Sequence, residues 1–375
     1  MAGEPSPGRR EEVNQQRTAR IRIGDVASAA GVSKSTVSIA FNNPKRLSPK
    51  TTARIHAVAD ELGYRPHPVA RMLAQRRTST LGILTPQALV VDFSNPFFSM
   101  FSQGVASVAE EFGYGLLFVS PLHGSLAQAA GRASVDGFVA IGLGEDHPEV
   151  EQIRSAGLPI VLVDSAAFPE HSSIEVDDET GAYAAAEHLL ALGHTEFLVL
   201  AVEPPHFAMG SGVTRPALEG VMARRMRGYR RALEASGVEL GDERVVTGPA
   251  SFDGGMVAFN SALESGLHFT AVLAMSDAMA IGAIHAAHQR GLTVPGDVSL
   301  VGFDDIDEAE HTHPTLTTVH QPVREKGAEA ARLLLAAVNL RGIGQPEHRR
   351  LETRLIIRAS TSRLAGERQE VSTST

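Results

Sequence analysis

Residues 23–38 read Ile23-Gly24-Asp25-Val26-Ala27-Ser28-Ala29-Ala30-Gly31-Val32-Ser33-Lys34-Ser35-Thr36-Val37-Ser38, and this stretch decides the fold of the N-terminal region. Val26, Ala27 and Ala30 form one helical face, and Gly31 ends that helix because glycine adopts left-handed backbone angles without strain. Ser33 stands where a helix N-cap is expected, before a second short helix with Val37 on its inner side. The stretch therefore predicts a helix-turn-helix, whose second helix (the reading helix) enters a DNA major groove.

Two motifs carry a resemblance to a known family. Residues 25–38 match every fixed position of the pattern D-V-A-x-x-A-G-V-S-x-x-T-V-S, and residues 66–74 match P-x-x-x-A-x-x-L-A. In this order and spacing they resemble the headpiece and hinge of the lactose-repressor (LacI/GalR) family of bacterial transcription regulators. The alternative is a helical hairpin that only packs within the fold.

The resemblance implies a set of DNA-contacting side chains in the reading helix, at backbone phosphates and in the hinge. They are Ile23, Ser33, Lys34, Ser35, Thr36, Ser38, Ile39, Asn42, Arg46, Ser48, Thr51, Ala70, Leu73 and Ala74. Leu73 matches the family's hinge leucine, which wedges between base pairs in the minor groove; such a wedge unstacks one step and bends the DNA. The alternative for Leu73 is that it covers the edge of a core.

Ile39 departs from the family pattern. The family usually has arginine at this end of the reading helix, and arginine forms a bidentate pair with guanine. Isoleucine offers at most an apolar contact with a thymine methyl group. We therefore expect the operator to differ at this position from the usual sites of the family.

A third headpiece helix has clear boundaries. Ser48 is its N-cap, Pro49 fits the first helical position, and apolar residues then recur at helical spacing as far as Gly63. We expect this helix to close a three-helix core around Val26, Val37 and Ile55.

Charge is divided unequally along the chain. The net charge is −9, yet residues 21–78 carry ten Lys and Arg against three Asp and Glu, a balance of +7. Residues 79–375 carry 20 against 37, a balance of −17, and residues 1–20 contribute +1. A small basic module on a large acidic body is typical of a DNA-binding head attached to a sensing domain.

Composition excludes several classes of protein. The length of 375 residues predicts two or three domains. Without a run of 18 apolar residues or an export-signal pattern, we expect a soluble, cytoplasmic bacterial protein that uses no membrane. The absence of cysteine excludes disulfides and thiolate metal sites. We expect disorder in residues 1–20 and 364–375, and a homodimer, because the C-terminal tail has no leucine heptads.

Beyond Thr80, short apolar runs alternate with helical segments. Residues 81–84, 115–119, 137–141, 160–163, 197–200, 271–274 and 298–301 are predicted as buried parallel strands. The fold class is therefore an all-α helix-turn-helix headpiece followed by an α/β two-lobed core with doubly wound parallel sheets, and the resemblance implies a core like that of periplasmic binding proteins.

The domain boundaries follow from these segments. We expect a headpiece at 21–65, a hinge helix or linker at 66–78 and a core for effector binding and dimerisation at 79–363. Within the core we expect an N-lobe of about 79–175 and 322–348, and a C-lobe of about 176–321 and 349–363. Each lobe is thus discontinuous in sequence.

Eight residues at strand ends or helix starts match effector positions of the family. They are Asn95, Phe97, Phe98, Asp164, Arg225, Phe252, Asp277 and Gln321. Asp277 belongs to the pattern [SN]-D-x-x-A-x-G, and Arg225 to R-x-x-G-[FYW]. Carboxylates facing arginine across a cleft suit a polyhydroxylated ligand. For each residue alone, the alternative is an ordinary loop residue, and one of Phe97 and Phe98 is expected in the core.

Some alternatives stay open. The loop at 203–223 either caps the cleft or is a surface insertion. The histidines show no ligand spacing, so we expect no metal and no other cofactor, and we find no catalytic constellation. We expect a regulator, in the form of a repressor of near-palindromic operator DNA, controlled by a sugar or, second, by a nucleoside or purine. The alternative is a solute-binding protein or an enzyme on the same core.

Overall fold

The computed structural model describes residues 21–66, 77–143, 149–155, 157–165, 169–203, 220–340 and 344–364. The chain forms two compact units, Met1–Thr78 and Ser79–Thr375. The predicted tails at 1–20 and, apart from Leu364, at 364–375 lie outside the described residues. So do most of the hinge with Ala70, Leu73 and Ala74, and most of the 203–223 loop.

The headpiece contains three helices and one short 3-10 turn. These are α2 (Ile23–Ala29), α3 (Lys34–Asn42), η1 (Pro44–Arg46) and α4 (Pro49–Glu61). As the spacing predicts, Val26, Val37 and Ile55 are fully buried and lie in one apolar cluster. Gly31 has a φ of 60°, a left-handed angle that lets the chain turn sharply between α2 and α3.

The first sheet of the core has six parallel strands. Its order is β11-β5-β4-β3-β1-β2, and neighbouring strands are parallel throughout. Its strands are β1 (Thr80–Leu84), β2 (Gly115–Val119), β3 (Gly137–Ile141), β4 (Ile160–Val163), β5 (Ser172–Val176) and β11 (His348–Leu351). The associated helices are α6 (Leu89–Asp92), α7 (Pro96–Glu111), α8 (Leu126–Arg132), α9 (Val150–Arg154) and α14 (Val323–Asn339).

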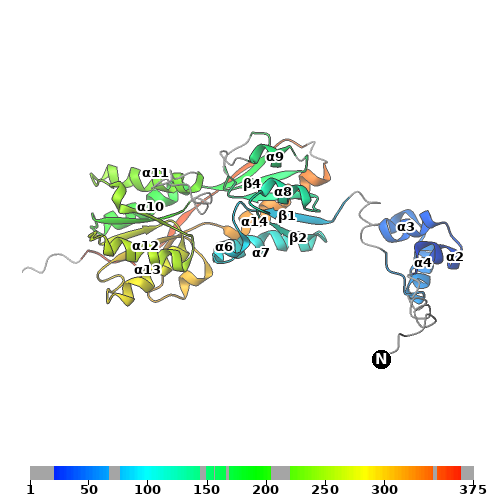
Figure 1. Cartoon of the computed structure of the whole chain (residues 1–375), viewed down its shortest axis with the longest axis horizontal. Helices are drawn as coiled ribbons and strands as arrows, with labels where there is room; N and C mark the ends of the chain where they lie inside the picture. The colour runs from blue at the N-terminus through cyan, green and yellow to red at the C-terminus, as the bar shows by residue number, and fades with distance from the viewer. Residues whose placement is uncertain are drawn as a thin grey trace, which may run out of the picture. The chain divides into compact units, whose positions relative to one another are not determined.

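The second sheet has the order β12-β10-β9-β8-β6-β7. Its strands are β6 (Phe197–Val202), β7 (Val245–Gly248), β8 (Ala271–Ala274), β9 (Ser299–Asp304), β10 (Thr317–His320) and β12 (Arg354–Ile356), the last of which is antiparallel. Its helices are α10 (Asp178–Ala191), α11 (Gly220–Ala235), α12 (Phe252–Glu264) and α13 (Asp277–Gln289), with short turns η3 (Asp242–Arg244) and η4 (Asp307–Glu310). Figure 1 shows α10 and α11 on one face and α12 and α13 on the other.

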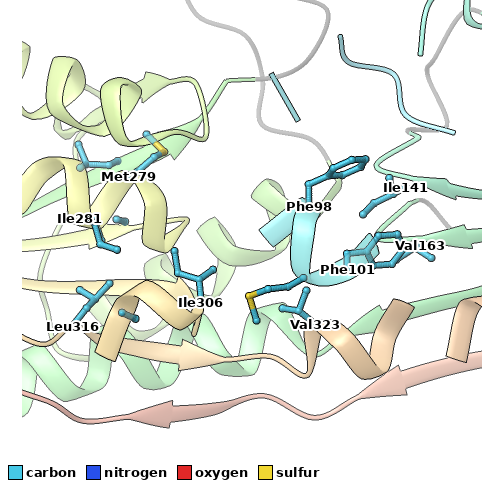
Figure 2. Packing of buried hydrophobic residues seen from close by; sticks show 14 of the residues in the cluster. Phe98, Phe101, Ile141, Val163, Met279, Ile281, Ile306, Leu316 and Val323 are labelled. Atoms are coloured by element: carbon cyan, nitrogen blue, oxygen red, sulfur yellow. The ribbon is translucent and has the colours of Figure 1, made fainter. Parts of the chain in front are cut away.

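The chain crosses between the two sheets three times. It leaves the first sheet after β5, returns through Gln321 and Pro322 into α14, and crosses again between β11 and β12. Apolar packing also continues from one sheet to the other within a single cluster. In Figure 2, Phe101 and Val323 lie at the first-sheet end of this cluster, and Met279 and Leu316 at the second-sheet end. This shared packing brings the carboxyl ends of both sheets into one body.

The predicted fold class is confirmed, with two differences in detail. Residues 115–119 form a strand, but β2 lies at the sheet edge, and exposed and half-buried residues alternate along most of it instead of being buried. An edge strand has only one neighbour, so an apolar run alone cannot distinguish it from a central strand. Strands β5, β10, β11 and β12 were not predicted, because their sequences are mixed in polarity, and β7 was expected only as a strand-like segment at residues 244–246. Among the described residues, no helix has the length and apolar character that a membrane span needs.

Candidate functional site

The reading helix α3 begins at a well-formed cap. Ser33 Oγ accepts a hydrogen bond from the Thr36 amide at 3.1 Å and lies 2.6 Å from Ser35 Oγ. Val37 and Ala40 are buried on the inner side, whereas Ser33, Lys34 and Ser35 are exposed. Thr36, Ser38 and Ile39 are half-buried. The helix therefore presents a small polar face at its N-terminal end, which suits a major groove.

Gly24 provides room for the side chain of Lys34. A Cβ at residue 24 would lie 3.1 Å from Lys34 Cε and 3.7 Å from its Nζ. The end of the Lys34 side chain thus lies close to Gly24 at the start of α2.

A second polar and basic surface surrounds the start of α4. Ser48 Oγ accepts from the Thr51 amide at 3.1 Å and lies 2.8 Å from Thr51 Oγ1. Asn42 Nδ2 donates to Ser38 Oγ at 3.1 Å, so these two predicted DNA contacts come from adjacent turns of one helix. Arg46 is exposed on η1, while Ile23 is half-buried and packs against the headpiece core.

In the core, a buried polar network joins the carboxyl ends of the two sheets. Lys326, on α14, donates to both carboxylate oxygens of Asp164 (2.9 and 2.7 Å) and to Gln321 Oε1. Gln321 Nε2 donates to Asp304 Oδ1 at 2.6 Å. Asp304 Oδ1 lies 3.5 Å from Nη1 of Arg225. Predicted residues from the two sheets therefore belong to one connected set.

Arg225 occupies the second-sheet end of this network. Its Nε donates to Asp178 Oδ1 at 2.9 Å, and its Nη1 donates to the carbonyl of Met275. Its guanidinium carbon lies 3.6 Å from the centre of the Phe303 ring. Burial alone would lower the pKa of Arg225, but Asp178 and Asp304 raise it above its ordinary value, so the residue stays charged. The neighbouring Arg224 donates to Asp178 Oδ2 at 3.0 Å.

Two network carboxylates stand on unusual backbone. Asp164 has a φ of 52° and Asp304 a φ of 125°, angles that non-glycine residues seldom adopt. Asp164 follows β4, and Asp304 is the last residue of β9. Strain of this kind costs on the order of 1–3 kcal/mol per residue and concentrates at functional sites.

Asp277 lies beside the network and is fully buried. Its Oδ1 accepts from Thr318 Oγ1 at 2.5 Å, and its Oδ2 accepts from the Ile306 amide at 2.9 Å. Burial, and then the nearby charge of Asp304, raise the pKa of Asp277 to about 8. The group is therefore mostly uncharged at neutral pH.

Asp277→Asn should remove a pH dependence of stability. Between pH 3.8 and about 8 the folded chain holds a proton on Asp277 that the unfolded chain has lost. This contribution to stability is complete below pH 3.8 and is lost as pH rises to about 8. The unfolding free energy of the unsubstituted protein, minus that of the variant, should fall as pH rises across this window in urea titrations. If the unfolding free energies of the two proteins change with pH in the same way, this prediction is wrong.

The other predicted effector residues take separate positions. Asn95 Oδ1 accepts from the Phe97 amide at 3.0 Å and caps α7. Phe98 is in the core and packs edge-on against Phe93, whereas Phe97 is half-buried with its ring centre 5.3 Å from Lys326 Nζ. One of the two phenylalanines is thus core, as predicted. Phe252 packs against the apolar cluster.

Sequence reasoning missed Lys326, Asp178 and Asp304 as members of the site. Asp304 stands in Val301-Gly302-Phe303-Asp304-Asp305, a strand-end motif that marks its location but not its role. Lys326 had a detectable signal, because it falls on the apolar face of α14 formed by Val323, Gly327 and Ala330. Among the described residues, no group of three or more His, Asp and Glu could hold a metal ion.

The two units match separate family models. Residues 22–67 match the model described as bacterial regulatory proteins, lacI family, and residues 186–361 match a periplasmic binding protein-like domain. The HTH-type transcriptional regulator DegA of Bacillus subtilis is 34% identical over 91% of this chain and 98% of its own length. Catabolite control protein A of Priestia megaterium is 32% identical over 85% of this chain and 93% of its own length.

Solved structures agree with these matches. The transcriptional regulator CelR in complex with cellobiose is 29% identical, covers 91% of this chain and 100% of its own, and has a TM-score of 0.66. The lac repressor dimer bound to operator and an anti-inducer is 26% identical, covers 91% of this chain and 99% of its own, and has a TM-score of 0.75. A LacI family regulator from Enterococcus faecium with bound ribose is 27% identical, covers 76% and 100%, and has a TM-score of 0.64.

Proposed function

Because this chain belongs to the lacI family of bacterial regulatory proteins and is a DNA-binding transcriptional regulator, we propose that it acts as a homodimeric repressor whose operator affinity is set by a sugar bound at the buried polar network. DegA and the matched family are transcriptional regulators, so the enzyme alternative is set aside. The proposal places the protein in the bacterial cytoplasm, with its operator.

The buried polar network carries the effector part of this proposal. It connects Asp164 and Gln321 to Arg225 through Lys326 and Asp304, so it reaches from the end of β4 to α11. A ligand that exchanges contacts with this network changes how the two lobes are joined. Effector and DNA affinities are then coupled, and each changes the other by the same factor.

The sugar is favoured over a nucleoside by the ligands of related proteins. CelR is described with cellobiose, and the Enterococcus faecium regulator with ribose. Sugar hydroxyl groups both donate and accept hydrogen bonds. The carboxylates of the network accept them, its cations donate them, and the Gln321 amide does both. A nucleoside or purine remains the second candidate, with the half-buried Phe97 as the surface on which its base would stack.

The DNA part of the proposal assigns roles within the headpiece. Lys34, Ser35 and Thr36 would read base edges, since they stand at the N-terminal end of α3. Arg46, Ser48 and Thr51 would hold phosphates and set the register of the headpiece on the duplex. The lac repressor structure is of a dimer on operator DNA, which supports two headpieces on a near-palindromic site.

Selection of sites from a random DNA pool by the purified protein tests this function. An enriched palindrome is expected, and adding cellobiose, D-ribose, D-galactose or D-glucose should change retention of the selected DNA. If no sugar affects retention of the enriched site but adenosine or hypoxanthine releases it, the effector is a nucleoside or purine and not a sugar. Absence of enrichment under all conditions would contradict the regulator mechanism.

Ile39→Arg should change operator preference at one symmetric pair of base pairs. Arginine forms a bidentate pair with guanine that discriminates by about 1–3 kcal/mol, roughly 5- to 150-fold, whereas isoleucine cannot form such a pair. Site selection with the variant should therefore enrich guanine where the unsubstituted protein does not. Thr51→Ala is the control, and it should weaken all sites about equally. An unchanged sequence preference in Ile39→Arg would place residue 39 away from the bases.

A further inference from the structure

Lys326 is a fully buried cation with every donor engaged. Its side chain has no exposed surface, and its ammonium group donates to the two oxygens of Asp164 and to Gln321 Oε1. Lysine is almost never fully buried unless it is paired. Helix α14 packs on β3, β4 and β5, so it holds Lys326 directly against the end of β4, where Asp164 stands.

The charges of the described network balance. Its three cations are Lys326, Arg224 and Arg225, and its three anions are Asp164, Asp178 and Asp304. Each cation contacts at least one of these anions within 3.5 Å. Asp277 adds little charge at neutral pH, because burial raises its pKa to about 8. A further charge brought in by a ligand would therefore have no counter-ion within the set.

A ligand charge in such a place is costly, whereas a hydroxyl group is not. Removing an ion from water is unfavourable unless an opposite charge compensates it. A hydroxyl group can replace one side-chain contact by donating to Asp164 or accepting from Lys326, and it leaves the net charge unchanged. The discrimination is thus between neutral and charged ligands of almost the same shape.

We propose that Lys326 is a specificity-determining residue that, by neutralising Asp164, restricts the effector to uncharged polyhydroxylated sugars. Amino sugars, sugar acids and sugar phosphates are excluded. This inference rests on the proposed function, namely that a sugar binds beside Asp164 and Gln321. Without Lys326, the same strand end would present an unpaired carboxylate and favour a cationic ligand.

The first test compares neutral sugars with charged analogues of nearly equal size. Binding to the full chain is measured by calorimetry for D-glucose, D-glucosamine and D-glucuronate, for the three corresponding galactose compounds, and for cellobiose, D-ribose and ribose 5-phosphate. For the neutral sugar that binds, each charged analogue should bind at least about tenfold weaker, the factor that 1.4 kcal/mol represents. A charged analogue that binds as tightly as its parent would overturn the inference and leave the sugar-controlled regulator intact. If no sugar binds, the proposed function fails as well.

The second test changes the charge of the pair itself. Asp164→Asn leaves Lys326 uncompensated, so binding should shift at least about tenfold toward the uronate relative to the neutral sugar. Lys326→Met leaves Asp164 uncompensated, so it should shift by a similar factor toward the amino sugar. The double variant should regain preference for the neutral sugar and melt at a higher temperature than either single variant.

A surface ion pair that joins Arg324 of the same helix to Asp307 of η4 provides the matched control. Arg324 Nη2 lies 2.5 Å from Asp307, and both side chains are largely exposed. Arg324→Met and Asp307→Asn should therefore leave the order of ligand preference unchanged. If the network variants fold but keep the original order, or if the double variant melts below both single variants, Lys326 does not select the ligand by charge.

Discussion

Asp178→Ala should lower the free energy of unfolding of the core by about 3–5 kcal/mol, the cost of removing one partner from a buried ion pair. The carboxylate of Asp178 has no exposed surface and accepts from Arg224 Nε and Arg225 Nε. The substitution leaves two arginines without their main counter-ion, and Arg225 retains the weaker 3.5 Å contact with Asp304, the Met275 carbonyl and the Phe303 ring. Urea denaturation followed by circular dichroism measures the loss.

Asp242→Ala is the matched control for that variant. Asp242 pairs with Arg230 of the same helix α11 at 3.1 Å, but both side chains are exposed. Exposed pairs contribute at most about 1 kcal/mol, so this variant should unfold almost like the unsubstituted protein. Equal losses for the two variants would show that burial of the Asp178 pair has no special energetic role.

Gly282→Ala should be the second most disruptive substitution, costing about 3 kcal/mol because it overpacks the contact between α12 and α13. A Cβ at residue 282 would lie 1.9 Å from the carbonyl oxygen of Phe252, which is backbone and cannot rotate away. On the facing helix α12, a Cβ at residue 255 would lie 2.1 Å from the carbonyl oxygen of Met279. The two helices approach closely through these glycines, and a methyl group forces them apart.

Gly131→Ala tests whether the loss comes from crowding. Gly131 lies in α8, and an added Cβ would meet no atom within 4 Å. Alanine is favoured over glycine in a helix by about 1 kcal/mol, so this variant should be slightly more stable. If both glycine variants raise the melting temperature, the close approach of α12 and α13 does not limit stability. If Gly282→Ala also reduces the effect of sugar on DNA retention, the displacement of α13 extends to Asp277 at its N-terminal end.

The sequence predicted the headpiece well because its determinants are local. The N-caps Ser33 and Ser48, the turn at Gly31 and the spacing of Val26, Val37 and Ile55 act within a few residues of one another. Six central strands, β1, β3, β4, β6, β8 and β9, were equally recognisable, since their burial on both faces produces uninterrupted apolar runs. The central strands β5 and β10 are mixed in polarity and were missed.

The composition of the polar network was less predictable. Asp164, Arg225 and Gln321 were found by motif and by their places at strand or helix ends. Lys326 follows Asp164 by 162 residues, and their contact exists because α14 returns to the first sheet after the chain has built the second. A lysine within an apolar helical face signals that a partner exists, but the fold decides which carboxylate it is.

The three crossings between the sheets have a consequence for synthesis on the ribosome. The first lobe lacks α14 and β11 until translation has passed residue 351, although its β5 is complete at residue 176. These points are 175 residues apart, which takes roughly 9 to 35 s at a synthesis rate of about 5–20 residues per second. During that interval β5 has an unpaired edge, and until residue 326 has been synthesised Asp164 has no lysine partner. The first lobe can therefore be completed only after most of the second lobe has been synthesised.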